Sequence, residues 1–412
     1  MNKKKLLSII TSSVLLAGIA SNAVADVTSG SPDVIGIQEQ MQGGRNMQRG
    51  GGMQPGGRMQ PGGGQTGNQN IVNEPGKIVT SSVVNTASEL EADLSKAVRI
   101  TISDAENRID IEETGTYIIT GSSTDGSITV KKGTTGVVLI LEDLDLTSKT
   151  GAALSLNKDT EVKVIISGTV TLTDAENPAD EYSSDQAAAD AYDGAALKAK
   201  ANSMVYITGD GTLNILGKAK NGIKGGDEAS LILDGPTVQI GAANDGINVN
   251  YDITFLSGTV AISSGDDGIH ADHILTIGSS DGTGPVVYIA QCGEGLEGSI
   301  VNIFGGDITI NASDDAINAA NKDGLYANEL TYSINMTGGK VTINGQGDGF
   351  DSNNNINLIG GSAVINVQYR MGEAGVDYDG AYYISDDFEM NNNGGVSGPD
   401  AMGGGRGGWG RP

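Results

Sequence analysis

Short segments in which apolar and polar residues alternate recur along the chain from about residue 98. Several share one form, a glycine and a polar residue followed by alternating apolar residues, as in Gly211-Thr-Leu-Asn-Ile, Gly258-Thr-Val-Ala-Ile, Gly306-Asp-Ile-Thr-Ile and Gly339-Lys-Val-Thr-Ile. A second alternating pair precedes such glycines, for example Leu231/Leu233, Val301/Ile303 and Ile334/Met336. Alternation with a period of two predicts β-strands that each bury one face.

A turn containing an acid follows each of these strand pairs. Five isoleucines each precede an acid by five residues: Ile240 and Asp245, Ile262 and Asp267, Ile289 and Glu294, Ile310 and Asp315, Ile343 and Asp348. The acids lie 21 to 33 residues apart. A repeat of this length predicts a solenoid, because one unit alone cannot bury its own apolar face.

Three short strands per repeat predict an all-β fold, a right-handed single-stranded parallel β-helix with disordered Gly-rich tails. Parallel crossovers are nearly always right-handed, and neighbouring coils lie about 4.8 Å apart. A β-propeller fits less well, since its blades need about 40 residues and four strands.

Stacking in register places the acids in two files along one edge. We call Asp245, Asp267, Glu294, Asp315 and Asp348 the first file. The second file lies three residues further on and contains Asn248, His270, Glu297, Asn318 and Asp351. Two carboxylates about 4.8 Å apart repel by about 3.5 kcal/mol at an effective dielectric of ~20.

A hard cation would offset this repulsion, and Ca²⁺ binds six to eight oxygens from carboxylates, amides and carbonyls. The sequence therefore predicts calcium as a cofactor. The candidate ligands are Asp245, Asp266, Asp267, Glu294, Glu297, Asp314, Asp315, Asp348 and Asp351. The alternative is that the Asp-Gly pairs are turn chemistry alone, with Asp capping its own backbone and Gly at positive φ.

The composition limits the partners. The chain has 412 residues, 63 glycines and only 4% aromatic residues, which favours a stacked β architecture over an aromatic core. Its net charge of -26 argues against nucleic acid and anionic membrane surfaces. The single cysteine, Cys292, excludes an intramolecular disulfide framework.

The sequence predicts four segments along the chain. Residues 1–25 resemble a secretory signal peptide, with Lys3-Lys4-Lys5, an apolar run and Ala23-Val24-Ala25. Residues 26–80 are a Met/Gln/Gly/Arg-rich linker, 81–387 the β-helix and 388–412 a Gly-rich tail. We expect an exported monomer, extracellular or at the cell surface, with no membrane span. One acidic insertion, Asp174–Asp193, interrupts the repeat.

Two features suggest catalysis. Asp266-Asp267-Gly-Ile-His270 resembles a segment of polygalacturonases, but the Gly-His-Gly and Arg-x-Lys segments of those enzymes are absent. A pectate lyase needs an Arg or Lys base, and no arginine lies between Asp110 and Val367. Lys224 is the best candidate base in this reading, although a surface lysine is the simpler interpretation.

The repeated turns resemble those of secreted bacterial carbohydrate-binding domains with a pectate-lyase-like β-helix. The resemblance covers roughly residues 82–383 and rests on Asn221–Gly226, Asn244–Asn248, Gly265–Asp272, Gly347–Asn353 and Val376–Gly380. It implies calcium and binding of a plant cell-wall polysaccharide without cleavage. Ala316, Glu294 and Phe350 depart from the pattern.

The candidate glycan ligands are Lys224 and two insertion tyrosines, Tyr182 and Tyr192, with Tyr326, Tyr378, Tyr382 and Tyr383 as further stacking residues. The acidic files favour a polyuronate, bridged by calcium, over cellulose. Three interpretations stay open: a calcium-dependent polysaccharide-binding protein, a pectate lyase-like or polygalacturonase-like enzyme, and a structural adhesin or surface-layer spacer.

Overall fold

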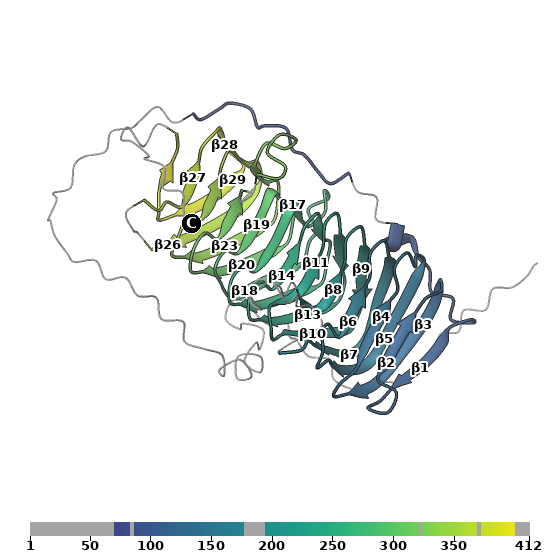
Figure 1. The fold of residues 1–412 in the computed structure, drawn as a ribbon. Helices are drawn as coiled ribbons and strands as arrows, with labels where there is room; N and C mark the ends of the chain where they lie inside the picture. Colours follow the sequence, from purple (N-terminus) through teal and green to yellow (C-terminus); the bar gives the residue numbers. More distant parts are fainter. Residues whose placement is uncertain (1–69, 83–85, 177–193, 321–323, 369–371, 400–412) are drawn as a thin grey trace, which may run out of the picture. The chain divides into compact units, whose positions relative to one another are not determined.

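The computed structural model describes residues 70–82, 86–176, 194–320, 324–368 and 372–399. Within them the chain forms β-strands and one short 3₁₀ helix, η1 (Thr86–Glu89). Strands of neighbouring coils pair in parallel and build a β-solenoid of about ten turns (Figure 1). The predicted all-β parallel solenoid is confirmed, and its right-handed winding stays a prediction.

Each complete coil has three faces, whose strands stack from coil to coil. Face 1 contains β1 (Val98–Ile102), β9 (Met204–Gly209), β12 (Ser230–Asp234), β15 (Ile253–Phe255), β22 (Ser333–Met336), β25 (Asn355–Leu358) and β28 (Tyr382–Ile384). Face 2 contains β10 (Thr212–Gly217), β13 (Thr237–Ala242), β16 (Thr259–Ser264), β18 (Val286–Cys292), β20 (Asp307–Ala312), β23 (Lys340–Gly345), β26 (Gly361–Val367) and β29 (Phe388–Asn392).

Face 3 carries the residues that follow the acids. It contains β2 (Arg108–Ile111), β4 (Ser127–Val130), β6 (Leu154–Leu156), β8 (Ala195–Ala199), β11 (Asn221–Gly225), β14 (Ile247–Val249), β21 (Ile317–Ala319), β24 (Phe350–Ser352), β27 (Val376–Tyr378) and β30 (Val396–Ser397). Longer strands turn a corner: β3 (Gly115–Ser123), β5 (Val137–Thr147) and β7 (Glu161–Thr173) join faces 1 and 2, whereas β17 (Ile269–Ile277) and β19 (Leu296–Ile303) join faces 3 and 1.

The core consists of equivalent apolar residues stacked on one another. On face 2 the register pairs the five isoleucines in succession: Ile240, Ile262, Ile289, Ile310 and Ile343. All five are fully buried. Burial of one such side chain contributes about 1.5–3 kcal/mol, so a shift of register by one residue is strongly disfavoured. The register predicted from the isoleucine–acid spacing is confirmed.

Two kinds of glycine close the coils. Gly258 and Gly306, which precede face 2, have φ of 96° and 99° and need the left-handed region. Gly268 and Gly295, which follow the acids, do not have positive φ; a Cβ on Gly295 would lie 2.3 Å from the Ala316 carbonyl oxygen. Glycine follows the acids because successive turns approach closely. Positive φ as the reason for these Asp-Gly pairs is therefore wrong.

The segment 70–82 runs along the coils rather than forming part of a linker. The Val72 amide donates to the Tyr382 carbonyl (3.0 Å), the Gly76 amide to Asn357 Oδ1 (2.7 Å), and Asn302 Nδ2 to the Val79 carbonyl (3.0 Å). Ser81 donates to Asp252 further back along the solenoid. Residues 70–80, which we assigned to the linker, belong instead to the folded body, because they satisfy polar groups of several coils.

The coils also continue past residue 387, where we expected the body to end. β29 pairs with β26, and β30 with β27. The buried Phe388 begins β29, although glycine and asparagine dominate the residues that follow it. Among the described residues there is no helix with the length and hydropathy needed to cross a membrane.

Candidate functional site

The first file occupies the corner between faces 2 and 3. The amide of the residue after each acid donates to the carbonyl of the acid one coil later: Gly246 to Asp267 (2.8 Å), Gly268 to Glu294 (2.8 Å), Gly295 to Asp315 (3.1 Å) and Ala316 to Asp348 (2.9 Å). These hydrogen bonds align the backbones of the five acids from coil to coil.

The second file lies on face 3 and is continuous. Asn248 pairs with His270, His270 with Glu297, Glu297 with Asn318, and Asn318 with Asp351. The file also extends in both directions, since Lys198 and Lys224 precede Asn248 and Asp377 follows Asp351. Side chains of both files therefore lie side by side over several coils.

The carboxyl groups of the later coils are buried among like charges. Burial, and then the Glu297 carboxylate, raises the pKa of Glu294 to about 8. Burial, with Asp315 and Asp348 next to it, raises the pKa of Asp351 to about 8. Burial likewise raises the pKa of Asp348 to about 7 and that of Asp315 to about 6. A cation nearby would favour the charged forms of these groups at neutral pH.

Three of these carboxylates form what we call the C-terminal cluster: Asp315, Asp348 and Asp351. One oxygen from each lies within 4.8 Å of the others. The Asp348 amide donates to Asp315 Oδ1 (2.6 Å), and the Ala374 amide donates to Asp348 Oδ1. Backbone amides thus hold two of the three carboxylates, those of Asp315 and Asp348.

Asn318 borders the C-terminal cluster, in register with Asp351 and three residues after Asp315. It is only 7% exposed. Its Nδ2 donates to Glu294 Oε2 (2.9 Å), whereas its Oδ1 is buried and has no hydrogen-bond partner among the described residues. A buried acceptor without a partner costs about 1–3 kcal/mol, and a cation held by the neighbouring carboxylates would supply one.

The histidine cluster, which we define as Asp267, His270 and Glu297, lies earlier in the files. His270 Nδ1 lies 2.6 Å from Glu297 Oε2 and 3.3 Å from Asp267 Oδ2, and Nε2 lies 2.9 Å from Asp272 Oδ1. Burial alone would lower the pKa of His270, but hydrogen bonds to these three carboxylates raise it to about 12. A cationic ring therefore lies among carboxylates at this point of the column.

Lys224 is not the surface lysine expected from the sequence. It is buried, and its Nζ donates to Asn248 Oδ1 (2.6 Å) and Asn250 Oδ1 (2.7 Å). Asn248 in turn donates from Nδ2 to Asp245 Oδ2 (2.6 Å). Asn248 therefore links the Lys224 ammonium group to the Asp245 carboxylate through two hydrogen bonds. The link is possible because Lys224 and Asn248 are in register on adjacent coils of face 3.

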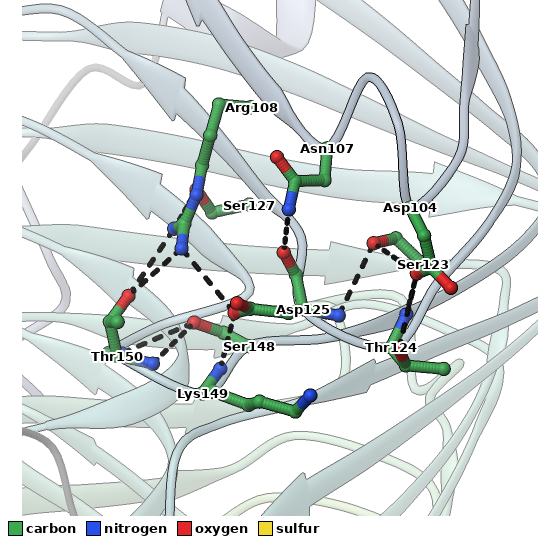
Figure 2. A network of polar contacts seen from close by, with 11 residues as sticks. Asp104, Asn107, Arg108, Ser123, Thr124, Asp125, Ser127, Ser148, Lys149 and Thr150 are labelled. Atoms are coloured by element: carbon green, nitrogen blue, oxygen red, sulfur yellow. Dashed lines mark hydrogen bonds and ion pairs between the residues drawn. The ribbon is translucent and has the colours of Figure 1, made fainter.

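The same corner is built differently in the first coils (Figure 2). Asp125 accepts from the Lys149 amide (3.1 Å) and pairs with Arg108 Nη2 (3.4 Å). Hydrogen bonds from Thr124 and Ser123 lower the pKa of Asp104. Asp104 and Asp125 of the first coils therefore have partners within the protein itself.

Other predicted site residues divide into three groups. Asp266 and Asp314 lie exposed at the turns, outside both clusters. Tyr378 and Tyr382 are core residues, so their prediction as glycan-stacking residues is wrong. Tyr182 and Tyr192 lie outside the described residues.

Sequence reasoning missed several partners. Asp272 holds His270 Nε2, and Asp377 prolongs the second file. Tyr251 stacks on His273 with ring centroids 4.4 Å apart, and Tyr326 contacts His273 edge-on at 4.7 Å. The signal for Asp377 was present, since Val376-Asp377 repeats the apolar–acid order of Phe350-Asp351. No local pattern indicates the Tyr326 contact, which joins coils far apart in the sequence.

Comparison with known proteins gives one family match over part of the chain. Residues 105–293 match the family described as "Carbohydrate-binding domain-containing protein". This confirms the resemblance for that stretch, although it says nothing of calcium. Among solved structures the chain is similar to "the polysaccharide lyase-like protein from C. thermocellum, Gadolinium derivative", with 19% identity, a TM-score of 0.44, and coverage of 73% of this chain and 98% of that one. No curated protein matches the chain.

Proposed function

We propose that this chain, whose residues 105–293 match the carbohydrate-binding domain family, is an exported, calcium-dependent polysaccharide-binding protein without catalytic activity. The observation that carries the proposal is the C-terminal cluster with its neighbour Asn318. One buried and two part-buried carboxylates lie together there beside a buried amide oxygen that has no hydrogen-bond partner among the described residues.

These residues fit calcium. The donor set is all oxygen: carboxylates from Asp315, Asp348 and Asp351, and the Oδ1 of Asn318. Hard cations of this type prefer carboxylate and amide oxygens and accept six to eight ligands, so positions would remain for a glycan or water. When bound, calcium supplies the positive charge that links protein carboxylates to those of a ligand.

Charge favours a polyuronate as that ligand. The chain has a net charge of -26, so an acidic glycan can approach the acidic corner only through a cation. The exposed Asp314 precedes Asp315 of the cluster, and Asp377 follows Asp351 in the second file. A cation bound between the acidic corner and the glycan would replace their repulsion by attraction.

The arrangement of Lys224 supports binding over a lyase reaction. A lyase base must reach the substrate with its amine, but Lys224 Nζ donates to two asparagines within the wall of face 3. The chain contains no arginine between Asp110 and Val367 to take its place.

Affinity electrophoresis of the full chain in gels containing polygalacturonate tests the proposal. We expect retardation with Ca²⁺ and none with EDTA. Asp351→Asn should weaken retardation, and calorimetric calcium affinity should fall on the order of tenfold, because ligand charge sets affinity. Asparagine already occupies this file position at Asn248 and Asn318, so the variant should fold.

Glu389→Gln is the matched control, since it removes one charge from an exposed position on β29. It should bind as the wild type does. Retardation that persists in EDTA would contradict the calcium requirement. No retardation in either gel would remove the polyuronate and leave a neutral glycan or a spacer role, and release of unsaturated uronate would establish a lyase instead.

A further inference from the structure

The histidine cluster differs chemically from the C-terminal cluster because one donor is a ring nitrogen. Asp267, His270 and Glu297 come from two successive coils and place three ligand atoms within 4.8 Å of one another. Their side chains are 16%, 18% and 10% exposed, so the group is largely shielded from water but not closed.

His270 cannot satisfy both acids by itself. Its Nδ1 faces Glu297 Oε2 at 2.6 Å and Asp267 Oδ2 at 3.3 Å, and one N–H cannot donate strongly to both. One oxygen of the Asp267 carboxylate also lies within 4.8 Å of one from Glu297. A divalent cation bound at Nδ1 would neutralise both carboxylates.

Asp272 holds the opposite side of the ring. Its Oδ1 lies 2.9 Å from His270 Nε2. A metal-binding histidine almost always donates its second ring N–H to a carboxylate or carbonyl, which fixes the ring with the other nitrogen toward the metal. The Asp272 contact leaves Nδ1 as the nitrogen directed at Asp267 and Glu297.

We propose that Asp267, His270 and Glu297 form a binding site for a divalent transition metal of the zinc type, separate from the calcium column. Imidazole nitrogen suits zinc and its neighbours, whereas calcium prefers oxygen. In a tetrahedral site, ligands about 2.0–2.2 Å from a zinc ion lie roughly 3.3–3.6 Å from one another. Asp267 Oδ2 lies 3.3 Å from Nδ1, and Glu297 Oε2, at 2.6 Å, would move outward as the metal replaces its hydrogen bond. Asp267 and Glu297, whose sequence pattern predicted calcium, are thereby assigned to a different metal.

The site does not depend on the proposed calcium function. The test is calorimetric titration with ZnCl₂ of the full chain, carried without a histidine tag and treated with EDTA beforehand. Saturating Ca²⁺ in the buffer occupies the all-oxygen C-terminal cluster, so the titration reports the histidine cluster. We expect one zinc site per chain. His270→Asn should weaken it at least tenfold while leaving the calcium isotherm unchanged, and Asp272→Asn should weaken it roughly tenfold through the lost orientation of the ring.

Asp351→Asn is the matched control, since it alters the C-terminal cluster and should leave zinc binding unchanged. Thermal unfolding checks that His270→Asn folds, as asparagine occupies the same file position at Asn248. Absence of zinc binding in the wild type would overturn the proposal, as would equal zinc affinity in His270→Asn. His270 would then be a built-in cation that replaces a metal at this coil.

Discussion

Asn318 donates its side-chain amide to the Glu294 carboxylate at 2.9 Å while its own buried carbonyl oxygen has no partner. One side chain therefore stabilises an acid of the preceding coil and offers an acceptor beside the acids of the next. In the second file, Lys224 and His270 supply positive charge to the earlier coils. Asn318 lies between these coils and the later ones, whose position in the file is occupied by the carboxylates of Asp351 and Asp377.

Replacement of Asn318 tests its role as a calcium ligand. Asn318→Ala removes an oxygen donor, so calcium affinity measured by calorimetry should fall on the order of tenfold. Asn344→Ala is the control, because Asn344 belongs to an exposed asparagine ladder of face 2 and donates to Asn311 at 3.0 Å. Equal calcium affinity in the two variants would exclude Asn318 from the site.

The metal-free protein should lose stability as the pH rises. The folded-state pKa values of Glu294, Asp348 and Asp351, about 8, 7 and 8, lie above the ordinary values of 4.5, 3.8 and 3.8. The folded state therefore binds more protons than the unfolded state between these limits, and the free energy of unfolding falls from about pH 4 to 8.

Thermal unfolding in EDTA across this range checks the sign. We expect Tm to fall with rising pH, less steeply in Asp351→Asn, and calcium to restore it at pH 8. A Tm in EDTA that rises through this range, or a variant that follows the wild type throughout, would show that these carboxyl groups do not set the pH dependence.

Lys224 should prove structural rather than functional. Lys224→Met removes the ammonium group that donates to Asn248 Oδ1 and Asn250 Oδ1. The free energy of unfolding should fall by about 1.5–3 kcal/mol, the range for hydrogen bonds to a charged group. Urea unfolding should report this loss. Calcium and polygalacturonate binding should match the wild type, and their loss in a folded variant would restore Lys224 as a ligand-binding residue.

The glycine after each acid should resist substitution because of close packing. A Cβ on Gly295 would lie 2.3 Å from the Ala316 carbonyl oxygen and 2.5 Å from Ile310 Cγ2. Gly295→Ala should therefore destabilise the protein by about 1–3 kcal/mol through overpacking. Ala316→Gly, the reverse change one coil later, is the comparison and should cost less. A stable Gly295→Ala protein would show that neighbouring coils can move apart.

Much of the fold follows from the repeat itself. The constant interval between Ile240 and Asp245, and between its four counterparts, predicted both the isoleucine stack and the first file, since a parallel solenoid aligns equivalent positions. The second file followed from the same register. Residues 70–80 could not be assigned in this way, because their partners lie on Tyr382, Asn357 and Asn302, hundreds of residues away.

The sequence by itself determined the period, the buried positions and the column of acids, because each depends on spacing within one repeat. Only the tertiary structure decided how each acid is satisfied. Equivalent positions carry Lys224, His270, Glu297 and Asp351, and their chemistry depends on which side chains the coils above and below present. Coulomb and hydrogen-bond energies change over a few ångströms. The spacing of the repeat therefore predicts which residues lie in a file, but not which side chains each of them contacts.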